Sequence, residues 1–152
     1  MSIIADLGPN MENLPDLLSQ FEEDLADYAL NLAIKGKMLE TTLKEQATWS
    51  AYYGERAVEL GIISKYLDAQ VKKVRAELVV RYNENYNPSL SERLMNSYID
   101  REDAYLSINE IGLEVSELLD KYKMILEAFK NRGYALRNIT EGRIADIHQV
   151  TL

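Results

Sequence analysis

The chain has 152 residues, a formal net charge of −8 and a hydrophobic fraction of 47%, values that favour one folded domain over a disordered chain. The absence of cysteine excludes disulfide scaffolds, zinc fingers and thiol catalysis. No apolar run approaches the ~20 residues that a membrane span requires, and the first ten residues show no secretory signal, so we expect a cytoplasmic protein without a membrane partner.

Charge is distributed unevenly along the chain. Residues 1–55 carry ten acidic and three basic side chains, whereas residues 56–81 carry six basic and three acidic ones. The pattern repeats, with nine acidic and two basic side chains over residues 82–120 and six basic and two acidic ones over residues 121–143. At physiological salt the Debye length is about 8 Å, so exposed charges that are farther apart interact weakly. A basic face is therefore compatible with an acidic protein, although ordinary solvated helix faces give the same pattern.

Apolar residues recur in steps of three and four through most of the chain, which predicts an all-α fold. A first stripe predicts a helix from about Asp16 to Gln46, and its leucines repeat every seven residues at Leu18, Leu25, Leu32 and Leu39. A second stripe predicts a helix over residues 60–78. This second helix either continues the first or follows a break near Gly54.

A turn is predicted over residues 83–89, because the residue before Pro88 is disfavoured in the helical region. Ser89, followed three residues later by a glutamate, predicts a capping box. We expect this box to begin a short helix that ends at about Ile99.

The clearest apolar stripe follows Ser107, which predicts a second capping box. We expect the helix that begins there to end at Gly133, because glycine is the usual residue just past a helix end. A short helical tail over residues 134–147 would follow.

The seven-residue spacing indicates a helical bundle or coiled-coil-like domain with a short C-terminal helical tail. The predicted organisation is an N-terminal arm over residues 1–15, a single all-α domain over residues 16–147 and a C-terminal tail over residues 148–152.

Candidate catalytic groups are sparse. The single histidine, His148, lies near the C-terminus, which leaves little from which to build a histidine metal site or a Ser-His-Asp arrangement. No glycine-rich phosphate loop occurs. The acidic residues at 22–24 and Asp27 resemble the magnesium-binding helix of all-α nucleotide pyrophosphatases, but Ala26 stands where that motif has its last glutamate. An enzyme is therefore the least favoured interpretation, and we expect no catalytic residue, metal or cofactor.

The two basic segments, residues 56–81 and 121–143, point to nucleic acid instead. On a helical wheel of the second stripe, three cations share one arc with a tyrosine beside them, and two further cations lie nearby. Cations that contact phosphates and aromatic rings that stack on bases are typical of proteins that bind single-stranded nucleic acid. The predicted DNA-binding residues are Lys65, Lys72, Lys73, Arg75, Arg81 and Tyr82.

The segment 118–143 (LLDKYKMILEAFKNRGYALRNITEGR) resembles the C-terminal part of the UvsY family, the recombination mediators of tailed phages. Both have an apolar helix that runs into an Arg-Gly-aromatic sequence, here residues 132–134, followed by small, aliphatic and basic residues. The basic helix over residues 68–82 is similar to the family's basic helix. The order of elements agrees from about residue 14 to residue 143.

The resemblance implies a non-enzymatic homo-oligomer in the host cytoplasm. Such a protein binds single-stranded DNA and helps a recombinase load in place of single-strand-binding protein. It implies DNA contacts at Lys72, Lys73, Arg75 and Arg81. It also implies that the C-terminal helices form the oligomer interface through an apolar set: Tyr122, Ile125, Phe129, Leu136 and Ile139.

The two acidic segments, residues 1–55 and 82–120, leave a second function open. An acidic helical interaction or inhibitor protein would bind a basic partner surface, since complementary fields speed such association. The candidate residues are Glu22, Glu23, Asp24 and Asp27.

Overall fold

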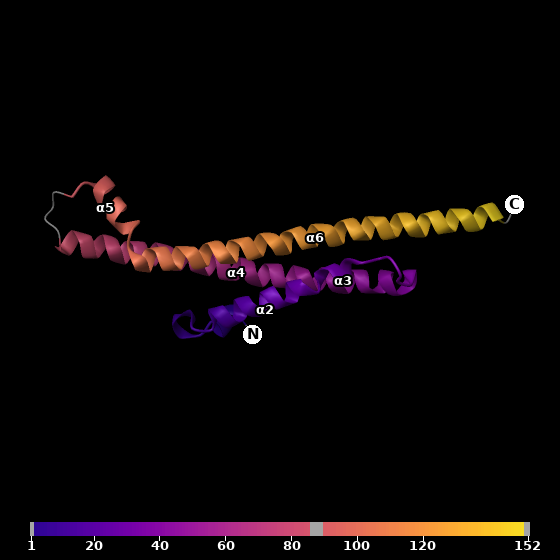
Figure 1. Ribbon diagram of the computed structural model, residues 1–152, viewed down its shortest axis with the longest axis horizontal. Coiled ribbons are helices and arrows are strands. Elements are labelled where there is room, and N and C mark those ends of the chain that lie inside the picture. Colours follow the sequence, from indigo (N-terminus) through magenta and orange to yellow (C-terminus); the bar gives the residue numbers. More distant parts are fainter. Residues whose placement is uncertain (1, 86–89, 151–152) are drawn as a thin grey trace. The chain divides into compact units, whose positions relative to one another are not determined.

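The computed structural model describes the backbone of residues 2–85 and 90–150, and the side chains of these residues up to residue 146. Throughout this part of the chain the regular structure is helical, which confirms the all-α prediction (Figure 1). The elements are α1 (Ile3–Asp6), a 3₁₀ turn (Pro9–Met11), α2 (Leu14–Ala26), α3 (Tyr28–Leu32), α4 (Leu39–Asn85), α5 (Glu92–Ile99) and α6 (Asp103–Val150).

The chain forms two compact units that interleave in sequence. Unit 1 comprises Met1–Asn13 and Glu59–Leu118, and unit 2 comprises Leu14–Val58 and Leu119–Leu152. The long helices α4 and α6 therefore each contribute one part to unit 1 and the other part to unit 2.

The core of unit 2 is an aromatic cluster. Tyr53 of α4 stacks on Phe129 of α6 with 5.1 Å between ring centroids, and Phe21 of α2 meets Tyr122 of α6 edge-on at 5.9 Å. The Tyr122 hydroxyl donates a hydrogen bond of 2.8 Å to the Phe21 carbonyl oxygen. All four side chains are buried. Burial of such large rings dominates the stability of a small core, so this cluster ties α2, α4 and α6 together.

The core of unit 1 is aliphatic. The second predicted stripe is confirmed, since its side chains at three- and four-residue steps supply buried residues from α4, and α5 and α6 supply the rest: Leu60, Ile63, Leu67 and Leu78, with Ile99, Val115 and Leu118. Helix α4 is continuous through Gly54, which settles the question of a break there.

The helix predicted from Asp16 to Gln46 is wrong as a single element. Helix α2 ends at Ala26, α3 is a short separate helix, and the chain is not helical over residues 33–38. Gly36 has φ +80° in this connection, a left-handed conformation that glycine adopts without steric cost. The leucine repeat continued across the break only because Leu32 ends α3 and Leu39 begins α4.

The predicted helix end at Gly133, with a separate helical tail, is also wrong. Helix α6 is continuous and extends to Val150. Gly133 lies inside it, and an added Cβ atom would lie 3.1 Å from Nε2 of Gln46 on α4. The glycine therefore allows a close approach between the two helices instead of ending one of them.

The predicted helix starts have mixed outcomes. Helix α6 begins at Asp103, so Ser107 lies inside the helix and its capping box is wrong. The short helix α5 ends at Ile99 as predicted. Its N-cap is Ser91, whose side-chain oxygen accepts a hydrogen bond of 3.3 Å from the Leu94 amide, whereas the predicted cap Ser89 lies outside the described residues.

Two glycine substitutions should change stability in opposite directions. Gly36→Ala forces an L side chain into the left-handed region, so we expect a loss of about 1–2 kcal/mol in the free energy of unfolding. Gly61→Ala lies inside α4 with open space around the added methyl, so we expect a gain of up to about 1 kcal/mol. Urea denaturation followed by far-UV circular dichroism measures both, and shifts of the same sign would contradict the assigned turn.

Candidate nucleic-acid interface

All six predicted DNA-binding residues lie on the part of α4 that belongs to unit 1. The side chains of Lys65, Lys72 and Lys73 are exposed. Among the side chains described, none lies within ion-pair distance of any of these three lysines. We call these three residues the lysine face. Lys65 and Lys72 are about two helical turns apart and point in nearly the same direction. Lys73 follows Lys72 in the chain, so its side chain is turned by about 100° around the helix axis.

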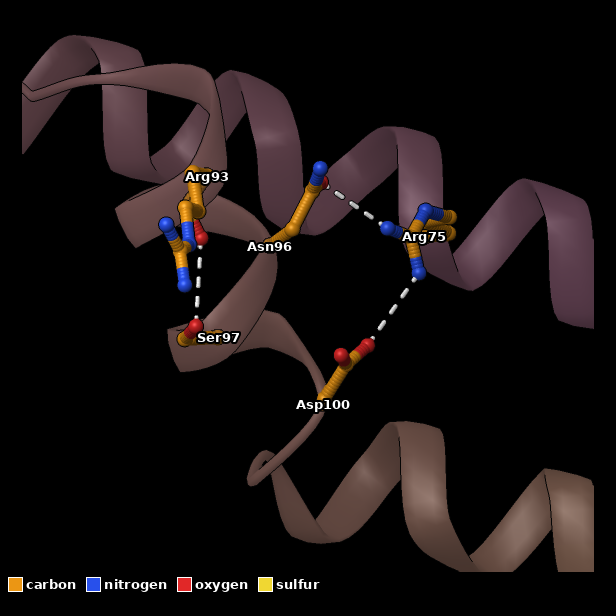
Figure 2. A network of polar contacts seen from close by, with 5 residues as sticks. All are labelled: Arg75, Arg93, Asn96, Ser97 and Asp100. Carbon is orange, nitrogen blue, oxygen red and sulfur yellow. Dashed lines mark hydrogen bonds and ion pairs between the residues drawn. The ribbon is translucent and has the colours of Figure 1, made fainter.

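Arg75 does not belong to this exposed set. Its Nη2 donates a hydrogen bond of 2.9 Å to Oδ1 of Asn96 on α5, and its Nη1 lies 3.4 Å from Oδ1 of Asp100 (Figure 2). Its guanidinium carbon is 5.6 Å from the ring centroid of Tyr105. The side chain is half-buried. Arg75 therefore fastens α5 to α4, and its donors are used inside unit 1.

Arg81 and Tyr82 are similarly engaged. Both bind the carboxylate of Glu102, Arg81 through Nη2 at 2.6 Å and Tyr82 through its hydroxyl. The Tyr82 ring also stacks on Tyr98 with 5.8 Å between centroids. Because Tyr82 and Arg81 stabilise the ionised carboxylate, the pKa of Glu102 falls below its ordinary value. The ring that sequence analysis assigned to base stacking thus already has an aromatic neighbour.

A groove of about 420 Å³ adjoins the lysine face in unit 1. Lys72 and the carboxylate of Asp68 line it from α4, and Asn109 lines it from α6, together with the hydroxyls of Ser64 and Ser116 and the apolar side chain of Leu113. Its size falls within the range of small-ligand sites. Sequence analysis missed Asn109 and Ser116, because short polar residues on a long helix usually face solvent and carry no distinguishing pattern.

The basic segment over residues 121–143 lies in unit 2, and several of its cations are paired or buried. Arg132 is only 4% exposed. Its Nε donates to the Leu32 carbonyl oxygen at 3.1 Å, its Nη1 donates to Oε1 of Gln46 at 2.5 Å, and burial lowers its pKa. Lys123 pairs with Asp120, and Lys130 pairs with Glu127. The exposed arginines in this segment are Arg137 and Arg143.

Most of the predicted oligomer-interface residues lie in the core of unit 2. Four of the five are at most 1% exposed, namely Tyr122, Ile125, Phe129 and Leu136. Their apolar surface is therefore covered by the chain itself. Ile139 is 38% exposed, and its place in an oligomer interface stays a prediction.

Within the described residues, no group of three or more histidine, cysteine or acidic side chains is arranged to hold a metal ion. None of the described helices is both long and apolar enough to cross a membrane. No protein-family model, curated protein or solved structure matches the chain.

The contacts of Arg81 and Tyr82 with the Glu102 carboxylate should make the free energy of unfolding depend on pH in the acid range. Because the folded-state pKa of Glu102 is depressed, its contribution is present above the unfolded value of about 4.5 and is lost as the pH falls through the folded value. We expect Glu102→Gln to destabilise the protein at about pH 7, and the difference from the unsubstituted chain to shrink by about pH 3. Urea denaturation at both pH values measures this. If the difference in unfolding free energy between the variant and the unsubstituted chain is the same at both pH values, the ionised state of Glu102 in these contacts is contradicted.

Proposed function

We propose that this protein binds single-stranded DNA through the lysine face of unit 1 and acts as a recombination mediator that helps a recombinase load in place of single-strand-binding protein. The observation that carries the proposal is the exposure of Lys65, Lys72 and Lys73 without ion-pair partners among the described side chains. The resemblance of residues 118–143 to recombination mediators supports the same function.

The lysine face suits phosphate contacts. Lys65 and Lys72 lie about 10 Å apart along one side of α4, since each residue advances the helix by about 1.5 Å. Lysine ammonium groups bind phosphates as point charges and release counterions, which favours binding that is independent of sequence.

The groove beside the lysine face suits a nucleobase. Lys72 belongs both to the lysine face and to the lining of the groove. A base next to a phosphate held by Lys72 would meet the amide of Asn109 and the hydroxyls of Ser64 and Ser116, which donate and accept hydrogen bonds. Leu113 is 65% exposed and offers an apolar surface to the face of the base. In this arrangement Arg75, Arg81 and Tyr82 hold the helices that support the surface.

Removing the lysine face should weaken DNA binding and flatten its salt dependence. For Lys65→Ala/Lys72→Ala/Lys73→Ala we expect at least about tenfold weaker binding at low salt. The slope of log affinity against log salt should decrease by about 2, since each phosphate contact to a single strand contributes about 0.7. Fluorescence anisotropy with a labelled single-stranded oligonucleotide measures both quantities.

The matched control removes three exposed cations of unit 2, as Lys35→Ala/Arg137→Ala/Arg143→Ala. This control changes the net charge equally and should leave the affinity within about twofold of the unsubstituted protein. Equal losses for both triple variants would show that binding depends on total charge, and would contradict a site on the lysine face.

The mediator step has its own assay. A tailed-phage recombinase is added to single-stranded DNA that is covered by single-strand-binding protein, and filament assembly is followed by fluorescence. We expect this chain to shorten the delay before assembly and the lysine-face variant not to do so. DNA binding without any effect on the delay would restrict the function to DNA binding.

An acidic interaction surface is the second candidate function. On α2 and just after it, Glu22, Glu23 and Asp27 are exposed, and no ion-pair partner lies near them among the described side chains. Asp24 differs, because Arg56 holds it at 2.8 Å. The predicted acidic set therefore divides into one structural carboxylate and three that face solvent.

A further inference from the structure

Unit 2 contains a cavity of about 330 Å³ whose lining combines carboxylates and aromatic rings. Its volume lies at the lower end of the range for ligand sites, which suits a single side chain more than a large ligand. The residues that give the cavity its character are Glu23, Asp24, Asp27, Trp49, Tyr52 and Tyr53.

The aromatic side chains of this cavity are held by their neighbours. Tyr53 is buried, its ring stacks on Phe129, and its hydroxyl accepts a hydrogen bond of 3.1 Å from Asn31. Tyr52 meets Tyr53 edge-on at 5.3 Å and Trp49 edge-on at 6.2 Å. Tyr52 and Trp49 remain partly exposed, so ring surface is accessible and already ordered.

The carboxylates around these rings are not all in use. Asp24 is bound by Arg56, whose Nε and Nη2 each lie 2.8 Å from its Oδ2. Burial and the neighbouring Asp24 raise the pKa of Tyr52. Glu23 and Asp27 are four residues apart, which places them on one side of the chain as it leaves α2. Both are exposed and lack an ion-pair partner among the described side chains. The cavity therefore presents two uncompensated negative charges beside aromatic rings.

Unit 2 already holds one guanidinium group by this combination. The guanidinium carbon of Arg56 lies 3.8 Å from the ring centroid of Phe21 while the same side chain pairs with Asp24. A cation over an aromatic face and a carboxylate at its edge stabilise each other, because the ring attracts the cation and the carboxylate accepts its hydrogen bonds.

We propose that the cavity binds an arginine side chain from a basic segment of a partner protein. The guanidinium would lie against Trp49 and Tyr52 and would donate hydrogen bonds to Glu23 and Asp27. Arginine fits better than lysine, because its planar group stacks on rings and binds carboxylates through two donors while losing less hydration. The proposal rests on the second candidate function and does not depend on DNA binding by unit 1.

Trp49 is the only tryptophan of the chain, so its fluorescence reports directly on the cavity. The probe is the peptide acetyl-Gly-Arg-Gly-Arg-Gly-amide, and the comparison peptides carry citrulline or lysine in place of both arginines. We expect the arginine peptide to change the fluorescence in a saturable way. Its affinity should exceed that of the uncharged citrulline peptide by about tenfold or more, and that of the lysine peptide by several-fold.

Substitutions in the cavity test whether the arginine peptide binds there. Glu23→Gln/Asp27→Asn should weaken binding of the arginine peptide by about tenfold or more, and Tyr52→Leu should weaken it by removing one ring. The matched control is Glu110→Gln/Glu114→Gln, which neutralises two exposed carboxylates of unit 1 and should leave the affinity unchanged. Far-UV circular dichroism verifies the helical content of each variant.

Three results would overturn the proposal. The first is equal binding of the arginine, lysine and citrulline peptides. The second is an equal loss in both acidic double variants, which would mean binding by total charge. The third is a change of oligomer mass in Glu23→Gln/Asp27→Asn without weaker peptide binding, which would assign the carboxylates to a contact with a second copy.

The DNA assay separates this proposal from the proposed mediator function. Glu23→Gln/Asp27→Asn should retain binding to the single-stranded oligonucleotide, and the lysine-face variant should retain binding to the arginine peptide. Failure of the peptide titration with intact DNA binding overturns only the cavity assignment.

Discussion

Guanidinium groups fasten the short helices of this protein to its long ones. Arg56 of α4 binds Asp24 and lies over Phe21 of α2, and Arg75 of α4 binds Asn96 and Asp100 at α5. Helices of this length are marginal in water on their own, so their position depends on contacts with a neighbour. An arginine side chain serves well, because its stem packs on apolar surface while its fork binds two acceptors.

The same contact is made at the end of α3. Arg132 of α6 donates to the carbonyl oxygen of Leu32, the last residue of α3, and to Gln46 of α4. No carboxylate pairs with it, and its Nη2 has no hydrogen-bond partner in the described part of the chain. Burial of a charge under these conditions is costly, which explains why its pKa is lowered. Its role is therefore structural, within the aromatic core of unit 2.

These guanidinium contacts distinguish the arginines of the basic segments from the lysines. Several arginines that sequence analysis counted as basic surface are used between helices, whereas Lys65, Lys72 and Lys73 stay exposed. The division follows from chemistry, because a planar fork gains more than an ammonium group from fixed acceptors. For the proposed DNA binding, screening limits the reach of the distant carboxylates that make up much of the net charge of −8. Asp68 is near, because it lines the same groove as Lys72.

Periodicity predicted the helical class, the buried stripe of α4 and the end of α5, because each depends on residues close in sequence. It could not predict the connection after α3, since Leu32 and Leu39 keep the seven-residue repeat on either side of it. It misread Gly133, because a glycine that ends a helix and one that allows close packing look alike in sequence. The partners of Arg75 lie more than twenty residues away, so its role was visible only once the helices were placed.

Hydrogen exchange of α5 in the variant Arg75→Lys tests the central role of the guanidinium contacts most directly. The substitution keeps the positive charge and removes the fork. We expect faster exchange of the backbone amides of Glu92–Ile99, with affinity for single-stranded DNA unchanged within about twofold. Unchanged protection of α5 together with weakened DNA binding would contradict this expectation, because Arg75 would then act on DNA and not on α5.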